Sequence, residues 1–230
     1  MPASDVSVEV EYDEYTKVTS PSIVNTSTII KPTSDIAIRW SGASDGVNNN
    51  IKSLSLALRK QSTSGTILYE KTGISPTATS LTIANDDWVN GIARGDKIYA
   101  TIQAIGAVSG FDGTKNSKHI ATINQLPSAP SVTASGSTIK ADTNITFTVV
   151  KGTDPDGQST TIWYKLGSSD TKTQLSGNTL TYTVDSNLPA GLNTIYFYTR
   201  DTLGEESSAT SKTFEVIYKP EIETVSMSLS

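Results

Sequence analysis

The sequence predicts an all-β chain made of two similar β-sandwiches in tandem, and three observations support that prediction. A stretch that begins at Pro21 is written again from Pro130, and the copies run without a gap to Asp45 and Asp154, an offset of 109 residues. Self-similarity at a fixed spacing indicates repeated structural units. Many short segments alternate apolar and polar residues, as half-buried strands do. No segment has the pattern of a long helix.

Composition narrows the classes of function. A chain of 230 residues with this repeat favours two domains of ordinary size, and 36% hydrophobic residues suffice for two thin cores. Abundant Ser and Thr with only 18% charged residues are typical of a β-rich extracellular or virion protein. The net charge of −5 and the absence of clustered Lys and Arg argue against nucleic-acid binding. The sequence has no cysteine, which excludes disulfides and thiol chemistry.

The first module is predicted to span residues 21–126, after an N-terminal arm at 1–20. Its strands are expected at 35–40, 51–59, 65–69, 80–83, 98–105 and 118–123, and 86–91 is expected to allow one short helical turn. Side chains expected to face inward are Ile36, Ile38, Trp40, Leu54, Leu56, Leu58, Ile98, Ala100, Ile102 and Ala104.

The second module is predicted to span residues 127–218, following a stiff proline-containing linker at 126–130. Its strands are expected at 144–150, 161–166, 179–184, 194–199 and 212–218, with a tail at 219–230. About seven short strands per copy, separated by regular turn signals, is the pattern of an immunoglobulin-like sandwich.

Both ends of the chain also have strand-like patterns. Residues 4–12 place three valines on one face, and the segment parallels the predicted last strand at 213–218. Two interpretations stay open for these ends. They are local strands or the ends of a longer array, or the first segment is an orphan strand that pairs with the open sheet edge of a neighbouring subunit. The first residues lack the pattern of a signal peptide, and no apolar run approaches the ~20 residues that cross a bilayer.

Several motifs together resemble a known family. The first copy resembles a fibronectin type III-like module. The resemblance rests on Trp40, the loop SGASDG after it, the leucine-alternating strand at 51–59, GDKIYATIQAIG and LPSAP. Such modules occur in bacteriophage tail, baseplate and capsid-decoration proteins and in bacterial surface proteins. The second copy, with TDPDGQSTTIWYKL, resembles the immunoglobulin-like repeats of the same proteins, although Val149 replaces the tryptophan. Trp163 stands in or near the place of the tryptophan of immunoglobulin domains. This resemblance implies a fold more strongly than a function.

Catalytic chemistry is not indicated by any motif. His119 is the one histidine, and its place in a closing strand, out of phase with Ile120, predicts a surface side chain rather than a base. Asp86 and Asp87 are adjacent and therefore point apart, whereas a glycosidase pair faces across a cleft. A solvated or helix-capping role is expected for them.

The sequence offers candidates for two binding chemistries, calcium and sugar. The turn Asp154-Pro155-Asp156-Gly157 resembles an oxygen-rich calcium loop, with Asp201 as a helper, but lacks the further carboxylates of such a site. A plain turn is expected. For sugars the candidate platform is Trp88, with Tyr12 and Tyr15 behind it, although a buried loop anchor is the expected role of Trp88 and a core position that of Trp40.

We therefore expect a non-enzymatic structural or attachment protein at the surface of a bacteriophage virion, with no catalytic, cofactor-binding or metal-binding residues and no cofactor. Its expected partners are capsid or tail scaffold proteins of the virion, with host surface glycans as a further class, and it is expected to be a homo-oligomer or bound to a lattice. Nucleic acid and membrane insertion are not expected. The alternative is an accessory binding module of a bacterial cell-surface adhesin or carbohydrate-active protein.

Overall fold

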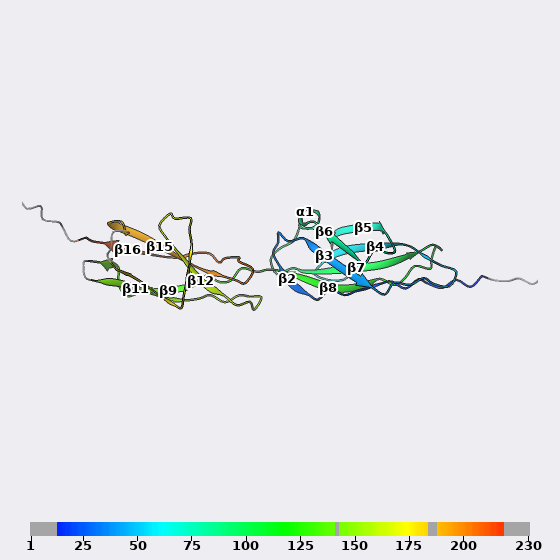
Figure 1. Cartoon of the computed structure of the whole chain (residues 1–230), viewed down its shortest axis with the longest axis horizontal. Helices are drawn as coiled ribbons and strands as arrows, with labels where there is room; N and C mark the ends of the chain where they lie inside the picture. The colour runs from blue at the N-terminus through cyan, green and yellow to red at the C-terminus, as the bar shows by residue number, and fades with distance from the viewer. Residues whose placement is uncertain (1–12, 141–142, 184–187, 219–230) are drawn as a thin grey trace, which may run out of the picture. The chain divides into compact units, whose positions relative to one another are not determined.

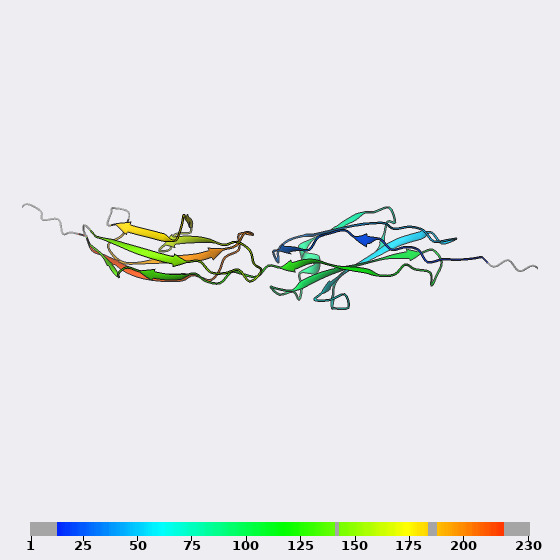
Figure 2. The same ribbon diagram turned by 90° about the horizontal axis from the view of Figure 1, so that it is seen from below.

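The computed structural model describes residues 13–140, 143–183 and 188–218 and divides the chain into two compact units, Met1–Asn124 and Gln125–Ser230 (Figure 1). Each unit is a β-sandwich of two layers, which Figure 2 shows edge-on. The strand-like segments at 4–12 and 219–230 lie outside the described residues. Within the described ranges, no helix has the length and apolarity needed to span a bilayer.

The first unit pairs a three-stranded sheet with a five-stranded sheet. Its strands are β1 (Ser22–Ile23), β2 (Thr28–Ile30), β3 (Ile36–Ser41), β4 (Ile51–Lys60), β5 (Ile67–Ile74), β6 (Ser80–Ile83), β7 (Lys97–Gly106) and β8 (Asn116–Ile123). The sheet orders are β1-β3-β6 and β2-β8-β7-β4-β5, and the short helix α1 (Asn85–Trp88) links β6 to β7.

The second unit repeats this topology strand for strand. Its strands are β9 (Ser131–Ala134), β10 (Thr138–Ile139), β11 (Asn144–Val150), β12 (Thr161–Leu166), β13 (Thr173–Leu175), β14 (Thr179–Thr183), β15 (Gly191–Arg200) and β16 (Thr210–Val216). The orders are β14-β11-β9 and β10-β16-β15-β12-β13. In both units the chain leaves the small sheet after its first strand and pairs in parallel with the last strand of the other sheet, β2 with β8 and β10 with β16.

The predicted all-β architecture of two tandem sandwiches is confirmed. In both units the fifth strand, β5 or β13, pairs with the strand before it, and the second strand, β2 or β10, pairs with the last. Together these pairings make the sheets three- and five-stranded instead of the ABED/CFG arrangement of constant immunoglobulin domains. The described residues contain eight strands per unit, and the ones not predicted are mostly two to four residues long.

The repeat seen in the sequence also holds in the cores. The buried side chains of β3 are Ile36, Ile38 and Trp40, and those of β11 are Ile145, Phe147 and Val149. Each is 109 residues from its counterpart, so the two strands occupy the same place in the fold. The predicted inward side chains of β4 and β7 are buried as well.

The two cores fill the same frame with different residues. The first core combines Trp40 and Trp88 with aliphatic side chains. In the second core, Phe147 packs against Phe197 and Phe214, with ring centroids 5.7 and 5.6 Å apart. The copies have therefore kept the backbone arrangement while exchanging the side chains that occupy it.

Part of the predicted N-terminal arm belongs to the first sandwich. The Thr16 N–H donates to the Val47 carbonyl at 3.1 Å, and the Ser20 hydroxyl accepts a hydrogen bond from the Ala104 N–H at 2.9 Å. Val18 is buried in the first core. Val18 is an apolar residue between polar neighbours. Because its side chain is buried in the first core, residues 16–20 lie against the first sandwich.

Candidate functional site on the second sandwich

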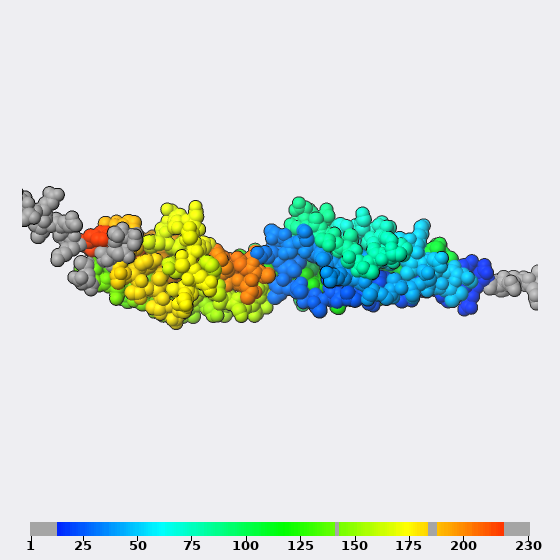
Figure 3. Space-filling model, viewed as in Figure 1, coloured from blue at the N-terminus to red at the C-terminus, as the bar shows by residue number. Residues whose placement is uncertain are grey.

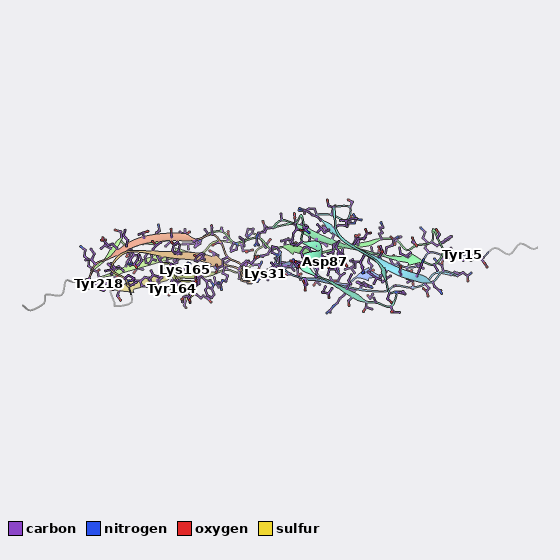
Figure 4. All side chains as sticks on the ribbon, turned by 90° about the horizontal axis from the view of Figure 1, so that it is seen from above. Tyr15, Lys31, Asp87, Tyr164, Lys165 and Tyr218 are labelled. Atoms are coloured by element: carbon purple, nitrogen blue, oxygen red, sulfur yellow. The ribbon has the colours of Figure 1, made fainter. Side chains whose placement is uncertain are left out.

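The outer face of the five-stranded sheet in the second unit carries a row of rings and cations. Strands β12 and β15 are antiparallel, with Trp163 opposite Tyr198 and Lys165 opposite Tyr196. The side chains between them in sequence, such as Ile162 and Phe197, point into the core. The two-residue period of a strand therefore places the rings and Lys165 (labelled in Figure 4) on the side away from the core.

Three cationic groups lie over these rings. The Arg200 guanidinium is 3.7 Å from the centroid of Trp163, the Lys172 ammonium is 3.9 Å from that of Tyr198, and Lys165 is 5.7 Å from that of Tyr196. Contacts of this kind contribute about 0.5–1 kcal/mol each at exposed sites. These contacts hold the cationic side chains against the sheet. They therefore reduce the conformational entropy that these side chains lose when a partner binds.

One carboxylate, Glu206, joins two of these cations. Its Oε1 accepts hydrogen bonds from Arg200 Nε at 3.0 Å and from a terminal guanidinium nitrogen at 2.5 Å, and Oε2 is bonded to Lys172. Burial alone would raise the pKa of Glu206, but the hydrogen bonds and charges of Lys172 and Arg200 outweigh it and lower the pKa below its ordinary value. Glu206 is therefore ionised at neutral pH.

We define the aromatic–cation strip as Trp163, Lys165, Lys172, Tyr196, Tyr198, Arg200 and Glu206. Its three cations and one carboxylate give it a net charge of about +2 in a chain of net charge −5. The corresponding face of the first sandwich differs: the cross-strand pairs there are Ser55/Gln103, Ala57/Thr101 and Arg59/Tyr99. The strip thus distinguishes the second copy from the first.

A groove of about 540 Å³ adjoins the strip. It is lined by apolar side chains of β11, β12 and β13, namely Val149, Val150, Ile162 and Leu175, and by polar residues that include Lys151 and Gln174. In Figure 3 the yellow surface of the second unit belongs to the β13–β14 part of the chain. The second copy therefore presents an apolar groove and a cationic face that share strands β12 and β13.

The groove follows from a difference between the copies at one core position. In the first unit, the Trp40 indole donates from Nε1 to the Ala78 carbonyl at 2.7 Å, so the ring reaches the loop that precedes β6. In the second unit the same position is Val149, which lines the groove together with residues 176–178 that precede β14. The smaller side chain leaves open the space that the indole fills in the first copy.

Trp163 does not have the place that the family resemblance implied. Its side chain is half-buried on the outer face, where it donates from Nε1 to the Thr161 hydroxyl at 3.0 Å and lies under Arg200. Ile162 supplies the buried side chain at this point of the core. The implied immunoglobulin-type core tryptophan is wrong, because the register of β12 against β15 turns residue 163 outward.

The candidate sugar platform is not formed by the described residues. Trp88 is fully buried in the first core, as expected of a loop anchor. Tyr15 packs against Phe111 with ring centroids 6.0 Å apart, and Figure 4 shows it well away from Asp87 on the first unit. Tyr12 lies outside the described residues. Trp40 is buried, as predicted.

The candidate acid–base residues do not meet. Asp86 and Asp87 are exposed in the first turn of α1. His119 is half-buried rather than on the open surface: its Nε2 lies 2.9 Å from the Ala121 carbonyl and its Nδ1 lies 3.1 Å from the Ser27 hydroxyl. The partner that would orient a catalytic histidine is here a backbone carbonyl instead of a carboxylate.

Internal hydrogen bonds take up the carboxylates of the Asp-Pro-Asp-Gly turn, apart from the buried Oδ2 of Asp154, which has no hydrogen-bond partner in the described part of the chain. Asp154 Oδ1 accepts from the Asp156 N–H at 2.8 Å, and the Asp156 carboxylate accepts from the backbone and side-chain nitrogens of Gln125 at 2.6 and 3.0 Å. Asp201 Oδ1 accepts from the Glu205 N–H. Among the described residues, no group of three or more His, Asp or Glu side chains is placed to hold a metal ion.

The aromatic–cation strip was not predicted. A signal was available, since IWYKL and YFYTR place rings and cations at alternating positions of two expected strands. Lys172 and Glu206 lie outside these two strands in the sequence. The sequence alone does not show that the fold brings them beside β12 and β15.

Comparisons with known proteins concern the fold. No family model and no curated protein matches the chain. Among solved structures, the fibronectin(III)-like modules of Clostridium thermocellum CbhA are 13% identical, with 86% of this chain and 94% of that chain covered and a TM-score of 0.36. A two-domain fibronectin type III segment of chicken tenascin is 13% identical, with 88% and 99% covered and a TM-score of 0.32. A 1.5-MDa bacterial ice-binding adhesin is 14% identical, with 82% and 60% covered and a TM-score of 0.45.

The chain consists of two β-sandwiches of the same topology in tandem. Because these TM-scores are all below 0.5, no role is inferred from the similar structures, and the function has to be argued from the surfaces of the sandwiches.

Proposed function

We propose that this chain is a non-enzymatic docking and attachment protein at the surface of a bacteriophage virion. The observation that carries the docking role is the difference between the two copies. One fold appears twice, and within the described ranges the second copy differs from the first in combining an open apolar groove at Val149 with the aromatic–cation strip. Grooves and sheet faces of this kind suit extended or protein partners.

The virion setting is supported by the resemblance of both modules to those of phage tail, baseplate and capsid-decoration proteins. The Ser- and Thr-rich, cysteine-free composition agrees with it. The proposed partners are capsid or tail scaffold proteins, and the chain would act as a homo-oligomer or as part of a lattice.

A second candidate is an accessory binding module of a bacterial surface adhesin or carbohydrate-active protein. The rings of Trp163 and Tyr198 favour it, because aromatic faces stack on sugars. Arg200 and Lys172 cover those faces, however, so a sugar would first have to displace the cations.

Particle composition tests the proposal. An antibody against the first sandwich is applied to particles and to cell envelopes purified from the cells that produce the chain. We expect gold label at a fixed position on the particles, with a fixed copy number by quantitative mass spectrometry. Label confined to cell envelopes would contradict the virion role and support the adhesin.

A further inference from the structure

The groove at Val149 lies beside an open sheet edge. In the strand order β10-β16-β15-β12-β13, strand β13 is the last, so its outer side has no neighbouring strand among the described residues. The backbone N–H and C=O groups on such an edge can pair with an added strand. Leu175 points to the core and Gln174 away from it, so an added strand would present alternate side chains to the groove and to the strip.

The chain itself contains a segment with matching chemistry. Residues 4–12, SDVSVEVEY, carry Val6, Val8 and Val10 at even positions and Asp5, Glu9 and Glu11 at odd positions. In an extended backbone the valines share one face and the carboxylates share the other. The first cationic side chain of the sequence is Lys17, so the segment carries acidic groups alone.

The charges of the segment and of the acceptor surface are opposite. The strip bears Lys165, Lys172 and Arg200 against the single carboxylate Glu206, and Lys151 lines the groove. A strand along β13 that turns its valines toward the groove turns its carboxylates toward the side of Lys172. Complementary charge of this kind fixes orientation and speeds association.

We propose that residues 4–12 of a second copy of this chain add as a strand to β13, with the valines in the groove and the carboxylates beside the aromatic–cation strip. This inference rests on the proposed docking role of the second sandwich and names its partner. Copies joined in this way associate head to tail, N-terminal segment to second sandwich, which generates chains or rings instead of a two-fold dimer.

The longer edge strand of the first unit is a poorer acceptor. Strand β5 pairs with β4 through two register shifts, and Gly73 near its end has φ of +67°. Its exposed Glu70 and Lys71 carry opposite charges, so β5 lacks the net positive charge that would attract an acidic segment. Bulges and charges are the usual means by which edge strands avoid pairing, and at the corresponding core position Trp40 fills the space that is open in the second unit.

One donor variant and two acceptor variants separate the donor from the acceptor. Deletion of residues 1–12 removes the donor segment and leaves residues 16–20, which belong to the first sandwich. Val149→Trp fills the groove with the residue that the first copy holds at this position. Val150→Glu, at a side chain that is 63% exposed, is a second acceptor variant that places a carboxylate in the groove without changing the core. Lys71→Glu on β5 is the charge control, and it lowers the net charge by two units where Val150→Glu lowers it by one.

Sedimentation velocity at low salt, from micromolar to millimolar protein, gives the readout. We expect the full chain and Lys71→Glu to self-associate, and the deletion, Val149→Trp and Val150→Glu to associate at least tenfold more weakly. Mixing the deletion variant with Val150→Glu should restore a one-to-one complex, because one keeps the groove and the other keeps the segment. High salt should weaken that complex.

Three results would overturn the proposal: a full chain that stays monomeric, self-association that survives both the deletion and the two acceptor substitutions, or a mixture that forms no complex. A synthetic peptide of residues 1–15 adds an independent probe, and a deletion variant that binds hyaluronate but not this peptide would point to a polysaccharide partner instead. Particle labelling is measured separately, so a failure here leaves the virion role standing and a failure there leaves the self-assembly result standing.

Discussion

Replacing Trp40 with valine, the residue of the second copy, should destabilise the first sandwich strongly. Trp40 is 3% exposed and its indole fills the space that is a groove in the second copy. Large-to-small changes at buried tryptophans cost about 3–5 kcal/mol for alanine, and valine keeps part of the contact, so we take about 3 kcal/mol. Loss of the hydrogen bond to the Ala78 carbonyl adds about 1 kcal/mol.

A loss of about 4 kcal/mol corresponds to a fall in Tm of roughly 15–30 °C for a module of ~100 residues. Differential scanning calorimetry measures the two unfolding transitions, and hydrogen exchange with mass spectrometry assigns each to a sandwich. We expect only the transition of the first sandwich to move. The reasoning would be refuted by a shift smaller than about 5 °C, or by an equal shift of both transitions.

Three further changes test other parts of the structure. Glu206→Gln should lower the stability of the second sandwich by about 1–2 kcal/mol, because Arg200 and Lys172 lose a charged partner; calorimetry checks this, and an unchanged second transition would contradict it. Burial alone would raise the pKa of Asp96, but the hydrogen bond and charge of Lys60, together with the hydrogen bonds from Ala93 and Gln61, lower it. The stability that Asp96 contributes is therefore present above its ordinary pKa of 3.8 and is lost as the pH falls through the depressed pKa. Asp96→Asn should flatten the acid limb of the stability curve of the first sandwich, and an unchanged acid limb would count against the ion pair with Lys60. Gly152→Ala places a Cβ 1.9 Å from the Ser128 carbonyl oxygen, so urea unfolding should show a loss of at least about 2 kcal/mol in the second sandwich, and a wild-type midpoint would refute that close approach.

The long strands could be predicted from the sequence because their periodicity directly reflects burial. Ile98, Ala100, Ile102 and Ala104 alternate with polar residues and are all buried. Strands of two to four residues, such as β10 and β13, hold too few positions for a period to show. Their existence depends on pairing with a distant strand, which the local sequence does not encode.

The candidate site could be predicted only in part, and the reason lies in register. Ile162, Trp163 and Tyr164 are all large and largely apolar, so the sequence does not say which of them faces the core. Pairing with β15 decides this and turns Trp163 outward. Lys172 and Glu206 reach the strip from segments outside the two strands, and no spacing in the sequence indicates that contact.

The open edge of β13 is the proposed docking site for a second copy of this chain. Hydrogen exchange of the backbone amides of Thr173–Leu175 tests it most directly, in the full chain and in the variant lacking residues 1–12, both at concentrations where the full chain associates. Strand addition predicts that the amides of β13 that point away from β12 exchange more slowly in the full chain and that the synthetic peptide restores slow exchange to the deletion variant. Equal exchange rates in all three samples would contradict the claim.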